Sequence, residues 1–207
     1  MFFGTLIGAR LGHCLFYEPD YYFKNPLEIL QTWNGGFASH GAALGILAAL
    51  CVFSRVERLP YLWITDRMAI VAALSCVLIR IGNLMNSEIF GLPTSLFWGF
   101  EFVRSPEWYR SPILKQPCHP TQIYEALAYL TIFILLCRLY FSKKEKPNNG
   151  ILFGIFLVSM FTVRFLIEFI KINQVDVEKG MLLNIGQLLS IPFIIWGIYL
   201  LLRPKLK

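Results

Sequence analysis

The chain has 207 residues, of which 56% are hydrophobic and only 15% are charged, and its formal net charge is +6. A soluble domain of this size needs more polar surface to cover its core, so the composition excludes an ordinary water-soluble globule. The length fits one bundle, and the sequence therefore predicts a single integral-membrane domain over residues 1–207.

Six apolar segments follow one another along the chain, each approaching the length of about 20 residues that crosses a bilayer core. They are residues 1–17, 36–53, 61–82, 121–141, 150–171 and 181–202. The first begins at Met1 without a polar flank, which indicates a helix entered partway along, and no cleavable signal peptide is expected. The expected fold is an all-α, polytopic transmembrane helical bundle with about six spans.

The basic residues predict the orientation of this bundle. They cluster after the second, fourth and sixth segments, at Arg55, Arg58, Arg138, Lys143, Lys144, Lys146, Arg203, Lys205 and Lys207. In the alternate connections the positive charge is diluted by acidic residues. Because cytoplasmic loops are enriched in Lys and Arg, the C-terminus is expected in the cytoplasm and the long loop at about 84–120 on the outer side.

The stretch "LIRIGNLMNSEIFG" places polar residues where the third apolar segment ends. Arg80 lies inside the segment, Asn83 follows one turn later on the same face, and Glu88 and Gly91 come after it. A snorkelling arginine near a helix end is one interpretation. An anion-binding arginine is the other, because ionisable residues inside a membrane are functional candidates.

Arg164, in "SMFTVRFLIEFIK", lies in the middle of the fifth segment. Glu168 is four residues further on, so an intrahelical ion pair between the two side chains is available. Such a pair would be either structural or a means of orienting Arg164 toward an anion, since Arg binds phosphate oxygens two at a time.

His40 lies among glycines in "WNGGFASHGAALG", at the outer end of the second segment. It is either a packed core histidine or the side chain best placed to take a proton near neutral pH. Arg10 offers a third cationic position or a structural tie between helices, and Glu125, in "HPTQIYE", could support the site or cap the bundle. The five cysteines are scattered without metal-ligand spacing, so no metal or other cofactor is expected.

Arginines inside a bilayer without a matching number of acids favour an anionic partner, and the abundant anions at that depth are phospholipid headgroups. Three classes of protein are then compared. One is an enzyme acting on an anionic lipid. The second is a transporter or channel for an anionic lipid or solute, although the inverted repeats common in transporters are not visible in this sequence. The third is a structural membrane subunit, which would not require Arg164 or His40 to be reachable by solvent.

The motifs resemble those of the prolipoprotein diacylglyceryl transferase family. "RIGNLMNSEIFG" is similar to the family signature R-x-G-N-x-x-N-x-E-x-x-G, "GGFASHGAALG" is similar to its G-G-M-S-x-H-G-x-x-x-G segment, and "GARLGHCLFY", "HPTQIYE" and "RFLIEFIK" occur in the expected order. The resemblance covers nearly the whole chain. Family members usually carry another helix before "GARLG", so the family's first N-terminal helix is apparently missing here.

The resemblance implies a transferase of the bacterial cytoplasmic (inner) membrane. Its expected reaction moves the diacylglyceryl group of phosphatidylglycerol to the lipobox cysteine of a prolipoprotein, with glycerol phosphate released. His40, Arg80 and Arg164 are the implied catalytic residues. The implied substrate-binding residues are Arg80, Asn83, Glu88, Gly91 and Glu168.

Overall fold

The computed structural model describes residues 1–16, 18–142, 149–172 and 183–203. Within these ranges, every secondary-structure element longer than an isolated β-bridge is a helix. The all-α expectation is confirmed for this part of the chain. Two compact units are present, Met1–Ile64 and Thr65–Lys207. We call them the N-terminal unit and the C-terminal unit and describe each by itself.

The N-terminal unit is built on two closely packed helices. Its elements are α1 (Phe2–Phe16), α2 (Pro19–Lys24), η1 (Pro26–Leu30), η2 (Thr32–Asn34), α3 (Ser39–Val56) and the first turn of α4. Glycines line the contact between α1 and α3, and a Cβ atom added to Gly8 or Gly45 would overlap the backbone of the facing helix. Small residues of this kind allow helices to approach closely in membranes.

Arg10 ties α1 to the segment that follows it. The guanidinium is buried and donates hydrogen bonds to the backbone carbonyls of Glu28 (2.6 Å) and Ile29 (3.0 Å), and a further one to the carbonyl of Gly35. Of the two interpretations offered for Arg10, the structural tie is the one that these hydrogen bonds support.

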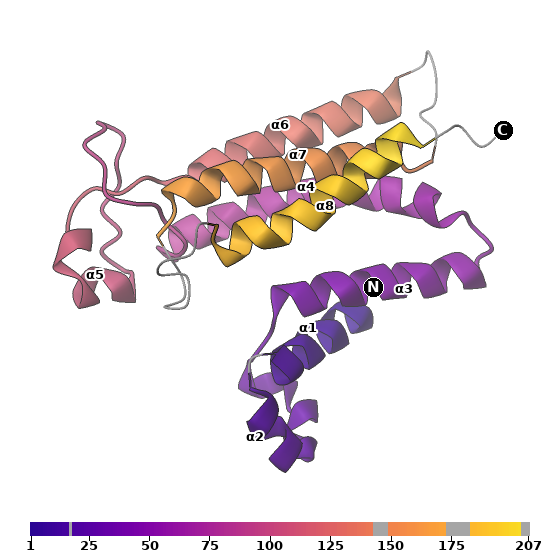
Figure 1. Cartoon of the computed structure of the whole chain (residues 1–207), viewed down its shortest axis with the longest axis horizontal. Coiled ribbons are helices and arrows are strands. Elements are labelled where there is room, and N and C mark those ends of the chain that lie inside the picture. Colours follow the sequence, from indigo (N-terminus) through magenta and orange to yellow (C-terminus); the bar gives the residue numbers. More distant parts are fainter. Residues whose placement is uncertain (17, 143–148, 173–182, 204–207) are drawn as a thin grey trace. The chain divides into compact units, whose positions relative to one another are not determined.

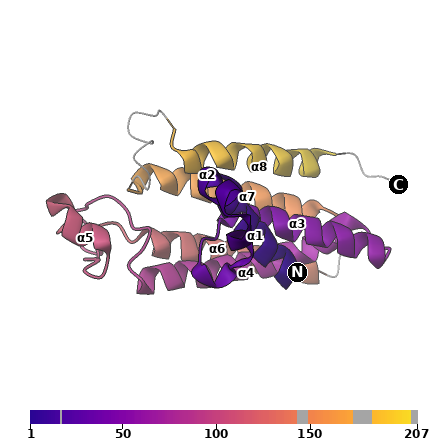
Figure 2. The same cartoon turned by 90° about the horizontal axis from the view of Figure 1, so that it is seen from below.

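The C-terminal unit contains four long helices that run alongside one another (Figures 1 and 2). Its elements are α4 (Tyr61–Met85), α5 (Pro106–Arg110), η3 (Pro112–Leu114), α6 (Thr121–Phe141), α7 (Ile151–Ile167), η4 (Glu168–Ile170) and α8 (Ile185–Leu202). Buried apolar side chains of α4, α6 and α7 form its core, with Val77, Leu136 and Met160 among them. Burying these side chains against one another holds the helices in register.

Three helices are long and apolar enough to cross a membrane by length and composition, namely Tyr61–Met85, Thr121–Phe141 and Ile151–Ile170. Two shorter apolar helices cover Gly41–Val56 and Gly186–Leu202. The expected segment 121–141 coincides with α6, and the others differ from the observed helices by a few residues at their ends. These helices establish the membrane character of the protein, whereas the number of six spans stays a prediction.

Polar caps fix both ends of the C-terminal unit. Asp66 of α4 is buried and accepts hydrogen bonds from the backbone N–H groups of Gly150 (2.7 Å) and Phe153 (2.8 Å), where α7 begins. A carboxylate at this place satisfies backbone donors that a helix N-terminus leaves unpaired. At the other end Asn184 and Gln187 form a capping box that starts α8.

At the loop end of this unit, α4 ends, α6 begins, α7 ends and α8 begins. The connection from α4 to α6 is ordered there by backbone pairing, with bridges Gly91–Lys171, Pro93–Cys118 and Phe100–Cys118. Its small core stacks the rings of Phe90 and Phe102 at a centroid distance of 4.5 Å. Burial raises the pKa of the Cys118 thiol, which keeps this cysteine protonated and unreactive.

Candidate functional site

Arg80 lies on α4 near the loop end, with a side chain that is 12% exposed. Its Nε atom is 2.9 Å from Oε2 of Glu125 on α6, and its Nη1 atom donates to Oδ1 of Asn83 at 3.3 Å. The second interaction joins residues one helical turn apart, as the sequence spacing predicts. The guanidinium is thus held through Nε and Nη1, and a snorkelling side chain directed only at water would not have these partners.

Glu125 also binds two side chains other than Arg80. Its carboxylate is fully buried, and Oε1 accepts hydrogen bonds from Nζ of Lys171 and from the hydroxyl of Tyr129, each at 3.1 Å. Nζ of Lys171 also lies 3.4 Å from Oε2 of Glu168. Arg80, Glu125, Lys171 and Glu168 therefore form a chain of alternating charges across α4, α6 and the end of α7, which we call the ion chain.

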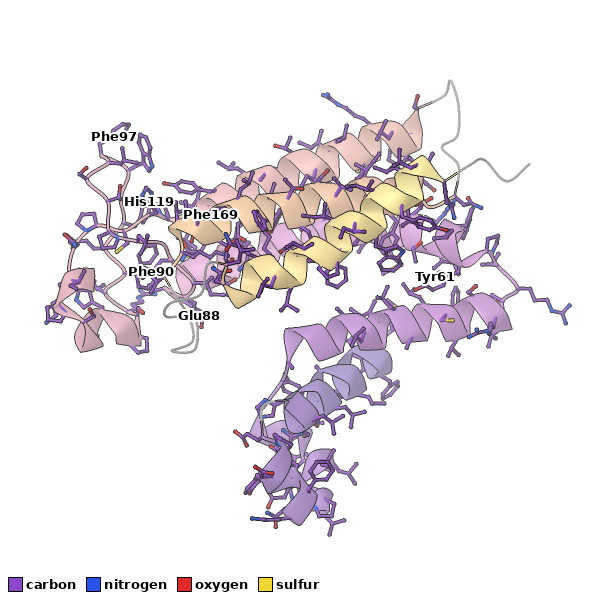
Figure 3. The ribbon with its side chains drawn as sticks, in the orientation of Figure 1. Tyr61, Glu88, Phe90, Phe97, His119 and Phe169 are labelled. Carbon is purple, nitrogen blue, oxygen red and sulfur yellow. The ribbon has the colours of Figure 1, made fainter. Side chains whose placement is uncertain are left out.

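The turn after α4 is held against the start of α6. Nδ2 of Asn83 donates to Oε2 of Glu88 at 3.1 Å, and Nε2 of Gln122 donates to the backbone carbonyl of Glu88 at 2.6 Å. Ser87 and Ile89 on either side of Glu88 both have a φ of 58°. Positive φ at a β-branched residue such as Ile89 is strained, and strain of this kind collects at functional sites. Figure 3 shows Glu88, His119 and Phe169 at this end of the unit.

Gly91 lies where the loop passes close to two helices. Its backbone N–H donates to the carbonyl of His119 at 2.8 Å. A Cβ atom at this position would be only 2.6 Å from the carbonyl oxygen of Ile170 and 2.7 Å from Cβ of His119. The structure thus gives a backbone reason for glycine at a position that the sequence motif associates with substrate binding.

Arg164 occupies the last part of α7, one turn before Glu168, and is half-buried. Within the described ranges, the ion pair of Glu168 is with Lys171, and none joins Arg164 to Glu168. The predicted intrahelical pair is therefore absent there, because Lys171 occupies the carboxylate instead.

His40 belongs to the first turn of α3, in the N-terminal unit. Its side chain lies outside the described part of the structure, so the proposed base remains a prediction from the sequence. Arg80, Asn83, Glu88, Gly91, Arg164 and Glu168 all belong to the C-terminal unit.

Sequence reasoning missed Lys171 and gave Gln122 no role. Lys171 is 5% exposed and Gln122 is fully buried, although both are polar. The signal for Lys171 was its spacing in "RFLIEFIK", three residues after Glu168, which places the two on one helix face. Gln122 is in the same turn of α6 as Glu125, within the quoted motif "HPTQIYE".

The site combines arginines, amides and carboxylates with apolar surroundings. A cavity of about 220 Å³ lies between α4 and α6, and Arg80 and Gln122 line it together with apolar side chains. Guanidinium groups bind phosphate oxygens through paired N–H donors. The fold thus defines a helical integral-membrane protein, and the cavity beside Arg80 presents an apolar surface.

Comparison with known proteins identifies the family to which the chain belongs. A family model for prolipoprotein diacylglyceryl transferases matches residues 1–203, and the chain belongs to that family. The phosphatidylglycerol–prolipoprotein diacylglyceryl transferase of Porphyromonas gingivalis is 50% identical over 98% of this chain and 74% of its own length. The enzymes of that name from Tolumonas auensis and Chloroherpeton thalassium are each 46% identical, over 98% of this chain and 75% and 73% of their own lengths.

The ion chain generates a stability prediction. Lys171→Met leaves the carboxylates of Glu125 and Glu168 without their shared cation, and removing one partner of a buried pair costs about 3–5 kcal/mol. We expect a clearly lower free energy of unfolding, measured by denaturant titration in detergent micelles. Lys171→Arg should retain most of the stability. Lys115→Met, at an exposed loop position, is the matched control, and a Lys171→Met protein as stable as this control would contradict the prediction.

Proposed function

We propose that this chain transfers the diacylglyceryl group of phosphatidylglycerol to the lipobox cysteine thiol of a prolipoprotein, forming a thioether and releasing glycerol phosphate. The observation that carries the proposal is the arrangement of Arg80. Glu125 and Asn83 fix its guanidinium beside an apolar cavity, in a chain of the transferase family. The transporter alternative gains no support from that family, whose relatives are named as transferases.

The reaction is a displacement at the glyceryl carbon that carries the phosphate ester. The acceptor thiol loses its proton, the sulfur forms a bond to this carbon, and the carbon–oxygen bond breaks. Its electron pair remains on the phosphate oxygen, so negative charge grows on the departing glycerol phosphate. Arg80 and Arg164 stabilise this charge, which is the kind of electrostatic contribution that often dominates catalysis.

We propose roles for the remaining site residues as well. Asn83 and Glu88 bind each other and flank the guanidinium of Arg80, so we assign them to substrate binding. Gly91 and Glu168 are assigned to the same function, Gly91 by permitting close backbone approach and Glu168 through its contact with Lys171. His40 is assigned the removal of the thiol proton, since a free thiol is mostly protonated at neutral pH.

We propose that the chain lies in the bacterial inner membrane as a single domain with about six spans. The unequal distribution of Lys and Arg supports a cytoplasmic C-terminus and an outward loop at about 84–120. The site then lies at the outer end of the bundle, where the anionic headgroups of the outer leaflet are within reach of Arg80.

A reporter fused to the C-terminus tests this orientation. We expect activity from a reporter that works in the cytoplasm and none from one that requires export. The same pair of reporters inserted in the loop near Ser95 should give the opposite result. An exported C-terminus would reverse the membrane side of every site residue.

Transfer by the Arg80→Lys variant tests the proposed function. Lysine keeps the positive charge but lacks the planar pair of donors, and losing a charged hydrogen bond costs about 1.5–3 kcal/mol. We expect kcat/KM for transfer from labelled phosphatidylglycerol to a lipobox peptide to fall by about 10- to 100-fold. Arg104→Lys, at an exposed loop position, is the control. A parent chain that transfers nothing would refute the function, and an unchanged Arg80→Lys variant would refute the role of Arg80.

His40→Gln tests the assignment of the base. Glutamine keeps a similar size but cannot take a proton near neutral pH, and general-base help is worth about 10²–10⁴-fold. The deficit should shrink as pH rises toward about 8.5, where more acceptor thiol ionises unaided. His119→Gln is the control, and its rate relative to the parent should not depend on pH. A constant deficit in His40→Gln would assign the base to another residue.

A further inference from the structure

The loop between α4 and α6 carries an apolar tip. Residues 92–100 read "LPTSLFWGF" and contain no charged side chain. Phe97 lies at the tip of the loop (Figure 3) and is 93% exposed, more than any other large hydrophobic residue that the structure describes. Leu96, Trp98 and Phe100 beside it are also exposed. A cluster of exposed apolar side chains marks a surface that contacts another molecule or a membrane.

Hydrogen bonds hold this tip in one conformation. Phe100 and Cys118 exchange two backbone hydrogen bonds of 3.0 and 2.9 Å, which fix the base of the tip. Within the tip, the N–H group of Gly99 donates to the carbonyl of Leu96 at 3.0 Å, and the N–H group of Leu96 donates to Oγ1 of Thr94 at 3.3 Å. These backbone donors are satisfied inside the loop, which lowers the cost of placing them beside lipid.

Trp98 ties the tip to the end of a membrane-spanning helix. Its Nε1 atom donates to the hydroxyl of Tyr124, in the first turn of α6, at 2.7 Å. Helix α6 has 21 residues, which extend about 31 Å and match the hydrocarbon core of about 30 Å. The first turn of α6 therefore belongs at the boundary of that core, and Trp98 belongs at headgroup depth, where Trp and Tyr are enriched in membrane proteins.

The exposed apolar surface of α6 continues into the tip. Leu127 lies one turn after Tyr124 on the same helix face and is exposed. At the other end of this surface, the rings of Phe97 and Trp98 contact each other edge to face, with centroids 4.6 Å apart. The headgroup layer is about 5–8 Å thick on each side of the bilayer, so a ring this close to Trp98 stays within it.

We propose that the loop tip, residues 96–98, docks on the surface of the bilayer leaflet at the loop end, with the ring of Phe97 inserted among the lipid headgroups. This inference goes beyond the proposed function, because it involves neither the reacting groups nor the site around Arg80. The docked tip fixes the height of the α4–α6 loop above the lipid. A protein segment is the competing partner, and the tie to α6 at headgroup depth favours lipid instead.

Photocrosslinking from the tip tests the proposal. Phe97 is replaced by p-benzoylphenylalanine, an aromatic residue that forms a bond to a neighbouring C–H group when it is irradiated. The full chain is placed in vesicles of phosphatidylethanolamine and phosphatidylglycerol, irradiated and digested with trypsin. Mass spectrometry then measures the share of the peptide containing residue 97 that carries a phospholipid. Because Phe97 is almost fully exposed, its replacement leaves the core intact, and the measurement does not require transfer activity.

Two further positions calibrate the result. The same photoreactive residue at Leu127 should give phospholipid adducts, because that side chain is exposed on α6. At Arg104, an exposed and charged position of the same loop, it should give few. We expect adducts at residue 97 to be several-fold more abundant than at residue 104 and similar to those at residue 127. Adducts at residue 97 that are no more abundant than at residue 104 would overturn the proposal.

A lipobox peptide added to the vesicles separates lipid from a protein partner. We expect the phospholipid adducts at residue 97 to persist in its presence. Their replacement by peptide adducts would refute docking on lipid and assign the tip to the binding of the acceptor. If the photoreactive variant does not accumulate, Phe97→Cys carrying a benzophenone maleimide replaces it, in a chain whose five native cysteines are changed to serine. The comparison with residue 104 is decisive in either form.

Discussion

The buried carboxylate of Glu125 is the point on which the site depends. A lone carboxylate inside a helical bundle is strongly disfavoured, and Glu125 is tolerated because Arg80 approaches it from α4 and Lys171 from the position directly after η4. The ion chain ends with Glu168, so it contains two positive and two negative charges, and its net charge is zero. Among the described residues, Arg164 belongs to none of the ion pairs, and ionisable residues inside membrane segments are candidates for function.

The loop end supplies rigidity to this arrangement. Backbone pairing joins Gly91 to the end of α7, and side chains at the start of α6 hold the strained turn around Glu88. The turn cannot shift without breaking hydrogen bonds to several elements at once. An arginine whose partners are fixed in this way would lose little freedom on binding an anion, which is the advantage of a preorganised site.

The helices could be predicted from the sequence because apolar length and composition depend on local residues, as the agreement over residues 121–141 illustrates. Arg80 and Asn83 could be paired for the same reason. The partners of Arg80 and Glu168 could not, since Glu125 is 45 positions after Arg80 and nothing in the spacing selects it. Two cationic residues, Arg164 and Lys171, lie at helical spacing from Glu168. The sequence analysis predicted Arg164 as its partner, whereas Lys171 forms the ion pair in the structure. That choice depends on how α7 is rotated against α6.

The wide separation of the ion-chain residues has a consequence for biogenesis. During synthesis α4 reaches the membrane with Arg80 already present, while Glu125 is still unmade and Lys171 lies further away. A charge at this depth weakens spontaneous insertion of a helix. The ion chain can therefore close only after α6 and Lys171 have been made. The electrostatic balance that serves the finished protein thereby imposes an order on its assembly.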